Sequence, residues 1–481
     1  MASKGRSWVK GILFTLLGIV VVLVAAVVGV LLWFDIPSNA SGMAAVSVCS
    51  AKFVGGRPGD AQQLMTQDVL PASGVLKAIS TEIDTNEKTV SATFLGAFKR
   101  SAAFAGDRGC VLDLQPDPGA RPYDPASQTP DPWPAGNTPL PPAQWPTGVN
   151  AAGLQAVVAK AFEGAGDPAA ANARGVAVVQ DNRLLVSQTA PGFEPGTGLH
   201  GWSMTKTVAA MLAYKKFTEV GLNIQQPVVD SFPANREPSW VADWRKDERA
   251  KITVADLMFM RDGLKITEGY DPTGDVIQML YGEPDMSGWA ASHPAEVPAG
   301  TRWQYLSATS NILAAVTRAQ FPSDAEYFAY PKTALFGPLS ATSASLATDT
   351  SGTEVASSYQ WASVGDWARF GQLMLSDGKW GDKQVIPPGW VKLATTPAMP
   401  SGDGHGYGAQ TWLPGDPVGG ECRSYPGVPA DTMSMEGHWG QIVAMVPSRN
   451  AVVVRLGWTF DKPQFDKCQF VADVLANLPP K

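Results

Sequence analysis

The sequence predicts an α+β fold, an α/β sandwich in which one five-stranded antiparallel sheet is flanked by helices and carries a helical insertion. Strand-like patterns occur early, over 175–180 and 183–188, and return late, over 409–413, 441–446 and 451–458. A long stretch of helical pattern separates the two groups. Joining all five strands in one sheet leaves helices to cover its faces and places the middle segment against its edge.

Turn and capping signals support the individual elements. Asp181-Asn182 separate the first two strand patterns, as in a β-hairpin. A helix over 151–163 precedes this hairpin, and another over 465–478 closes the chain. The runs Thr253 to Asp256 and Ser363 to Asp366 have the spacing of capping boxes, so each predicts the start of a helix.

The chain is expected to divide into five parts. A tail (1–10) precedes an apolar span (11–34), a small α+β extension (35–115), a proline-rich linker (116–149) and the main domain (150–481). The extension has one helical pattern and a hairpin pattern, and we find no chemistry there. Proline at the density of the linker denies both helix and sheet, so the linker should be extended.

Residues 11–34 are uncharged and mostly apolar, which is enough to span a bilayer. Basic residues precede this run and Asp35 follows it, so the positive-inside rule places residues 1–10 in the cytoplasm. This predicts a single-pass protein of the bacterial inner membrane with a periplasmic, extracytoplasmic catalytic domain. A cleaved signal peptide is the alternative, although its apolar core is usually shorter.

Cysteine and charge content narrow the function classes. Cys49 and Cys110, and Cys422 and Cys468, are close in sequence and are expected to form two disulfides. The net charge of −7 gives no indication of nucleic-acid binding. The four histidines lie at no metal-ligand spacing, so we expect neither a metal nor another cofactor.

Ser203 and Lys206 form the pattern Ser-x-x-Lys where a glycine-rich run meets a helical pattern that ends at Gly221. Lys206 would lie one turn after Ser203 on the same helix face. An amine beside a hydroxyl can accept its proton, and free N–H groups of a first helical turn can hold an oxyanion. The pattern indicates a nucleophilic serine, with a plain helix N-cap as the alternative interpretation.

The same spacing occurs at Ser376 and Lys379. Roughly one such match is expected by chance in a chain of this length. Ser376 follows a predicted helix and Lys379 follows a glycine turn, so we interpret this second match as accidental.

Three motifs in order resemble the serine β-lactamase and penicillin-binding-protein superfamily. They are Ser203-Met-Thr-Lys206, Tyr305-Leu-Ser307, and Gly437-His-Trp-Gly-Gln441 before a predicted strand. The stretch Asp366-Trp-Ala-Arg-Phe-Gly-Gln-Leu adds a narrower similarity to 6-aminohexanoate-dimer hydrolases and β-lactamase-fold esterases, which are related to class C β-lactamases.

The resemblance covers residues 150–481 and implies a β-lactamase-like fold. It implies that Ser203 attacks the carbonyl of a small amide or ester substrate while Lys206 and Tyr305 handle the proton. The function expected is a membrane-anchored serine hydrolase that works through an acyl-enzyme. Carboxylesterase, D,D-peptidase or β-lactamase activity remains the alternative, as does a catalytically silent cell-wall binding protein on the same fold.

The resemblance also implies an oxyanion and substrate-binding set: the N–H of Ser203, Ser307, and the edge-strand residues His438, Gly440 and Gln441. The second oxyanion donor stays open between His438 and Gln441. Ser307 is also a candidate N-cap of a helix over 311–319. Class C β-lactamases carry Lys-Thr-Gly where this chain has His-Trp-Gly, so efficient hydrolysis of anionic β-lactams is not expected.

Overall fold

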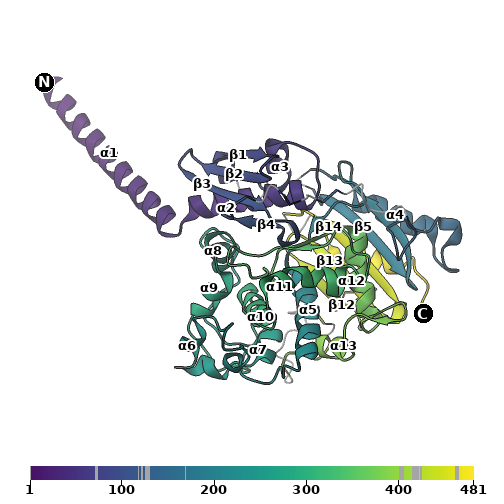
Figure 1. Ribbon diagram of the computed structural model, residues 1–481. Coiled ribbons are helices and arrows are strands. Elements are labelled where there is room, and N and C mark those ends of the chain that lie inside the picture. The colour runs from purple at the N-terminus through teal and green to yellow at the C-terminus, as the bar shows by residue number, and fades with distance from the viewer. Residues whose placement is uncertain are drawn as a thin grey trace.

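A computed structural model describes residues 2–70, 74–116, 119–120, 123–124, 131–167, 170–399, 406–413, 422, 425–460 and 465–480. Figure 1 shows helix α1 (Ala2–Trp33) extending away from a body in which helices and strands are packed together. The N-terminal extension lies at the top of that body, the helical insertion below it, and the main sheet beside both.

The predicted membrane anchor is wrong. Within the residues described, no helix is long and apolar enough to cross a membrane. The predicted inner-membrane location, with a cytoplasmic N-terminus and a periplasmic domain, is therefore withdrawn.

The main sheet has five antiparallel strands, which confirms the predicted fold class. Two strands come from the start of the main domain and three from its end. In spatial order the strands are β12 (Met433–Gly437), β13 (Gln441–Val446), β14 (Ala451–Gly457), β5 (Ala173–Gln180) and β6 (Arg183–Thr189).

Alternate residues of these strands enter two separate cores, because side chains of a strand point to opposite faces. Val176 and Val178 of β5 pack with α4 (Ala151–Ala161) and α14 (Lys467–Leu475). Ala177 and Val179 face the larger core, which includes α12 (Val364–Leu375). Helices on both faces give the sandwich that the sequence predicted.

One predicted strand is absent and another was missed. Asp181 and Asn182 both have positive φ, as a two-residue hairpin turn requires, so the first hairpin is confirmed. Residues 409–413 form no strand, because Gln410 takes a left-handed φ of 52° and breaks the extended run. The fifth strand is β12, which lies on the edge of the sheet.

The middle of the domain is helical, as predicted, and its helices begin where the capping patterns lie. The Thr253 hydroxyl accepts the Asp256 N–H at 3.1 Å, and Ser363 caps α12 in the same way at 3.2 Å. The helices are α5 (Thr205–Val220), α6 (Val241–Trp244), α7 (Val254–Met258), α8 (Asp275–Gly282), α9 (Met286–Ser292), α10 (Ser307–Ala319), α11 (Asp324–Pro331) and α13 (Trp390–Ala394).

Short strands complete the domain around these helices. A three-stranded sheet has the order β7 (Leu199–His200), β9 (Gln360–Ala362) and β8 (Ser345–Leu346). A two-stranded ribbon pairs β10 (Lys379–Trp380) with β11 (Lys383–Gln384). Strand β7 leads directly into the turn that carries Ser203 and so helps to position it.

The N-terminal extension shares its core with the main domain. Its own sheet has the order β1 (Ile79–Asp84), β2 (Thr89–Phe94), β3 (Phe98–Phe104) and β4 (Cys110–Leu112), with helices α2 (Ile36–Cys49) and α3 (Ala61–Asp68). Apolar residues of α2 and of these strands belong to the same hydrophobic cluster as residues of α5 and β14.

A buried ionic contact fastens the extension to the main domain. Asp68 at the end of α3 pairs with Arg57 of the extension and with Arg174 of β5, and all three side chains are buried. The backbone carbonyl of Asp68 also accepts the indole N–H of Trp458 at 3.0 Å. Arg174 lies over the Trp458 ring, 4.3 Å from its centroid.

Both predicted disulfides are present. Cys49 at the end of α2 is bonded to Cys110 of β4, with Cα atoms 6.0 Å apart. Cys422 is bonded to Cys468 of α14, with Cα atoms 4.7 Å apart. The first joins two elements of the extension, and the second ties residue 422 to the helix that covers the sheet.

Candidate active site

Ser203 lies in a single 3-10 turn, Trp202–Met204, between β7 and α5. Trp202 has a left-handed φ of 49°, an unfavourable conformation for a bulky residue that is often found at functional sites. Gly201 packs against the indole of Trp367, and a Cβ there would lie 2.1 Å from the ring. The turn is thus held by its surroundings and presents Ser203 at the start of α5.

Lys206, one turn later, is fully buried beside Ser203. Its Nζ lies 2.9 Å from Ser203 Oγ, 3.0 Å from Ser307 Oγ and 2.9 Å from the carbonyl oxygen of Ser357. The structure therefore brings together the serine and lysine of the first motif and the serine of the second. Ser203 makes no N-cap bond to α5, which removes the plain capping interpretation.

Burial lowers the pKa of Lys206 to about 8, because an ammonium group loses hydration in the interior, while the nearby Glu268 carboxylate opposes this shift. An amine with such a pKa is partly neutral near physiological pH. It can then accept a proton from the hydroxyl 2.9 Å away.

Tyr305 lies beside Lys206. Its ring is stacked on Trp412 with centroids 5.2 Å apart, and Lys206 Nζ lies 4.9 Å from its centroid. Burial raises the pKa of Tyr305 well above the usual value for tyrosine, and an interaction with the Ser203 side chain opposes this shift. The phenol thus keeps its proton where Lys206 tends to lose one, a separation typical of an acid and base pair.

Ser307 is held by Glu268, a residue that the sequence analysis did not identify. The Ser307 N–H donates to Glu268 Oε2 at 2.7 Å, and its hydroxyl donates to Oε1 at 2.6 Å. Ser307 is the first residue of α10, and its side chain makes no capping bond, so its predicted N-cap role is wrong. The carboxylate of Glu268 satisfies a free N–H of the first turn instead.

Tyr270 is a second residue that the sequence analysis missed. Its ring is stacked on His438 at 4.3 Å between centroids, and its pKa is raised by burial against the opposing effect of the Ser203 and Ser307 side chains. Glu268 and Tyr270 lie in an irregular loop between α7 and α8. No periodicity or known spacing connects this loop to Ser203, so the sequence offered no signal for either residue.

The edge-strand motif forms the turn between β12 and β13. Gly437 pairs with Gln441, and both Trp439 and Gly440 have positive φ. A Cβ on Gly437 would lie 2.2 Å from the carbonyl oxygen of Gly201, so only glycine lets this strand approach the Ser203 turn so closely. The buried Gln441 side chain donates to the His438 carbonyl at 3.0 Å and accepts from the Gly457 N–H at 2.8 Å.

A cavity of about 880 Å³ opens over Ser203, between the helical insertion and the sheet edge. His438 and Gly440 line it, whereas Gln441 does not. Its walls are largely aromatic, and its charged residues are Glu268, Glu436, Asp466 and Lys467. Lys467 pairs with Glu436, so the described lining presents more carboxylates than cations.

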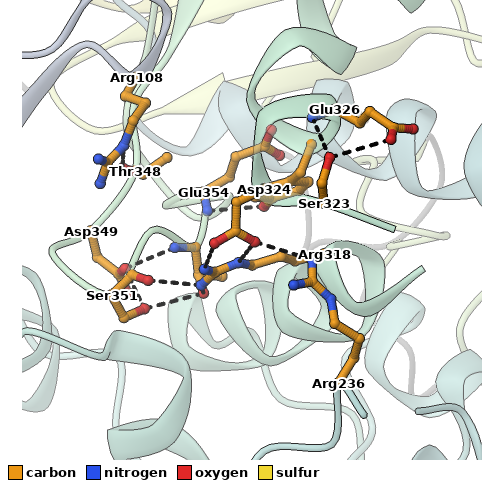
Figure 2. A network of polar contacts seen from close by, with 12 residues as sticks. Arg108, Arg236, Arg318, Ser323, Asp324, Glu326, Thr348, Asp349, Ser351 and Glu354 are labelled. Atoms are coloured by element: carbon orange, nitrogen blue, oxygen red, sulfur yellow. Dashed lines mark hydrogen bonds and ion pairs between the residues drawn. The ribbon is translucent and has the colours of Figure 1, made fainter. Parts of the chain in front are cut away.

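The Ser357 carbonyl that holds Lys206 follows a segment fixed by a polar network, shown in Figure 2. Asp349 accepts the Ser351 hydroxyl at 2.7 Å and the Thr353 N–H at 3.0 Å. Arg318 donates to the Ser351 carbonyl at 2.8 Å and pairs with Asp324 at 2.8 Å. This network holds the backbone that leads to Ser357.

The second Ser-x-x-Lys match has no such surroundings. Ser376 follows the last residue of α12, and Lys379 is exposed on β10. Across the described ranges, no group of three or more histidine, cysteine, aspartate or glutamate side chains is placed to hold a metal ion.

The family model for Beta-lactamase matches residues 154–476. The chain belongs to the beta-lactamase family. The match contains Ser203, Lys206, Tyr305 and the edge-strand turn, and it confirms the predicted membership of the serine β-lactamase and penicillin-binding-protein superfamily. Proteins of this family are generally serine hydrolases. Among curated proteins, no sequence matches this chain.

Solved structures are similar to this chain at low sequence identity. A protein of Bacteroides dorei classed as a beta-lactamase has a TM-score of 0.54 at 14% identity, over 69% of this chain and 99% of its own. A protein of Bacillus anthracis classed as a 6-aminohexanoate-dimer hydrolase has a TM-score of 0.48 at 16% identity, over 64% and 80%. A penicillin-binding protein homologue of Pyrococcus abyssi has 0.48 at 16%, over 68% and 77%.

Proposed function

We propose that this beta-lactamase family member hydrolyses a small ester or amide through an acyl-enzyme on Ser203. The observation that carries the proposal is the buried Lys206 amine 2.9 Å from the Ser203 hydroxyl, with the Tyr305 ring centroid 4.9 Å from the same amine. A serine needs such a base to become a nucleophile. The cavity over Ser203 leaves room for a small substrate.

The proposed reaction has two halves. In the first, Ser203 Oγ bonds to the substrate carbonyl carbon and its proton passes to Lys206. The bond to the leaving alcohol or amine then breaks, Tyr305 protonates that group, and Lys206 returns a proton to Tyr305. In the second half, water adds to the acyl-enzyme, one water proton returns to Ser203, and the acid is released.

We propose that the N–H of Ser203 and the N–H of His438 hold the oxyanion. His438 lines the cavity, whereas Gln441 is paired with Gly437 in the sheet and does not line it. The excess of carboxylates in the lining supports neutral or cationic substrates over the anionic β-lactams. Ser307 contributes through Lys206, and Gly440 allows the tight turn at the edge strand.

The test is covalent labelling with a fluorophosphonate, followed by a panel of nitrophenyl esters and anilides. The wild type should be labelled once, and the Ser203→Ala variant should be neither labelled nor active. The Ser376→Ala variant is the matched control and should be labelled like the wild type. If Ser203→Ala keeps wild-type hydrolysis of every substrate that the wild type cleaves, the nucleophile is elsewhere.

The pH dependence of kcat/KM tests the role of Lys206. A base must be neutral to act, so a pKa lowered to about 8 predicts that kcat/KM rises as the pH passes 8. The raised pKa of Tyr305 keeps the acid protonated, so the rate should stay high as the pH continues to rise toward 10. A profile that is flat around pH 8 for a neutral ester would contradict Lys206 as the base.

A further inference from the structure

The hydrogen-bond partners of Lys206 fix the direction in which it can share a proton. A neutral amine has two N–H donors and one lone pair. Its three partners are the Ser203 hydroxyl, the Ser307 hydroxyl and the Ser357 carbonyl. A carbonyl oxygen only accepts, so one N–H is committed to Ser357. The remaining N–H and the lone pair must be divided between two hydroxyls, and each hydroxyl can either donate or accept.

Glu268 determines which hydroxyl accepts the second N–H of Lys206 and which one faces its lone pair. A carboxylate only accepts, and its two oxygens take the N–H and the hydroxyl proton of Ser307 at 2.7 and 2.6 Å. The single proton of the Ser307 hydroxyl is donated to Glu268, so this hydroxyl can only accept a hydrogen bond from Lys206. The second N–H of the amine goes to Ser307, and the lone pair is left for the Ser203 proton.

From this geometry we infer that Glu268 is a positioning residue, which acts through Ser307 to keep the lone pair of Lys206 directed at Ser203. The inference rests on the proposed function, because it concerns the same base and nucleophile. It assigns Ser307 a specific part as well, that of an obligatory acceptor. Without the carboxylate, Ser307 could donate to Lys206 and occupy the lone pair before the nucleophile reaches it.

The substitution Glu268→Gln tests this division with little change of shape. The carbonyl oxygen of the new side-chain amide would face the Ser307 N–H, so the NH₂ group of that amide would donate to the Ser307 hydroxyl. That hydroxyl would then give its proton to Lys206. Fluorophosphonate labelling of Ser203 should slow by about 10- to 100-fold, the factor for breaking one buried hydrogen bond before each event.

If Glu268 acted only through its charge, Glu268→Gln would speed the labelling of Ser203 near neutral pH and not slow it. Its carboxylate raises the pKa of Lys206 against the effect of burial, so its removal would make the amine neutral at lower pH. Labelling near neutral pH would then become faster and the rise with pH would begin earlier. The inferred role predicts slower labelling even on the plateau above that rise, where Lys206 is neutral in both proteins.

Removing the Ser307 hydroxyl completes the test. In a Ser307→Ala background the lone pair has no competing donor, so adding Glu268→Gln should cost little further rate. A double-mutant cycle would show this as strong non-additivity. Glu237→Gln is the control: this glutamate pairs with Arg245 and lies outside the Lys206 hydrogen bonds, so its replacement should leave the labelling rate unchanged.

Two results would overturn the inference: plateau labelling of Glu268→Gln as fast as the wild type, or an equal loss from Glu268→Gln with and without the Ser307 hydroxyl. Thermal unfolding of each variant separates a slower reaction from a smaller folded fraction. Loss of all labelling in Ser203→Ala, measured alongside, supports the proposed function independently. Retained labelling there would refute the proposed function itself.

Discussion

The Lys206→Ala variant is expected to lose about 10³- to 10⁴-fold in kcat/KM for esters and amides, at the upper end of what general base catalysis provides. The Ser203 hydroxyl would keep its proton, because no other neutral amine lies beside it in the described part of the chain. The rise of activity near pH 8 should disappear with the lysine. Steady-state rates on a nitrophenyl ester, across that pH range, measure both effects.

The control for this variant comes from the second Ser-x-x-Lys match. Lys379 is exposed on β10, so Lys379→Ala should retain wild-type rates and the same pH profile. A Lys206→Ala enzyme that retained the profile would show that another group titrates near pH 8. In that case the proton would have to leave Ser203 by a different route.

The Arg369→Ala variant is expected to lose about 3–5 kcal/mol of unfolding free energy, the usual effect of removing one partner of a buried ion pair. Arg369 and Asp366 of α12 are both fully buried and lie 2.7 Å apart. The same guanidinium donates to the Pro134 and Gly136 carbonyls and to the Asn137 side chain, in the described part of the proline-rich segment. Its loss would remove the counter-charge of the buried Asp366 carboxylate and the hydrogen bonds donated to these three groups.

Urea unfolding followed by circular dichroism measures this change. The pair between Arg302 and Glu296 is a suitable control, because both side chains are more than one third exposed. Exposed pairs contribute about 0–1 kcal/mol, so Arg302→Ala should unfold near the wild-type midpoint. Equal midpoints for the Arg369 and Arg302 variants would show that the buried network adds little to stability.

Local signals made most of the fold predictable. The Asp181-Asn182 hairpin and the caps at Thr253 and Ser363 depend on neighbouring residues, and the structure has all of them. The run 409–413 failed because Gln410 turns left-handed, a conformation set by packing against α7, whose Leu257 carbonyl accepts the Gln410 side chain. Such long-range contacts cannot be predicted from an alternating pattern of apolar and polar residues.

The candidate site shows the same difference between residues that local signals reveal and residues placed by long-range contacts. Ser203 and Lys206 lie one helical turn apart, so their proximity follows from helix geometry, and Tyr305 and Ser307 came from the resemblance to a known family. Glu268 and Tyr270 reach the site from a loop without regular structure. Their part depends on where that loop folds back, which only the three-dimensional structure describes.

Because the extension and the main domain share one core, the segment that matches the family is shorter than the segment that folds together. The family match begins at residue 154, but the interior that supports it includes residues from Ala44 onward. A fragment cut to the boundaries of the family would retain Arg174 and discard Asp68, its buried counter-charge. A protein produced for study therefore has to include residues on both sides of the linker, and not only the segment that matches the family.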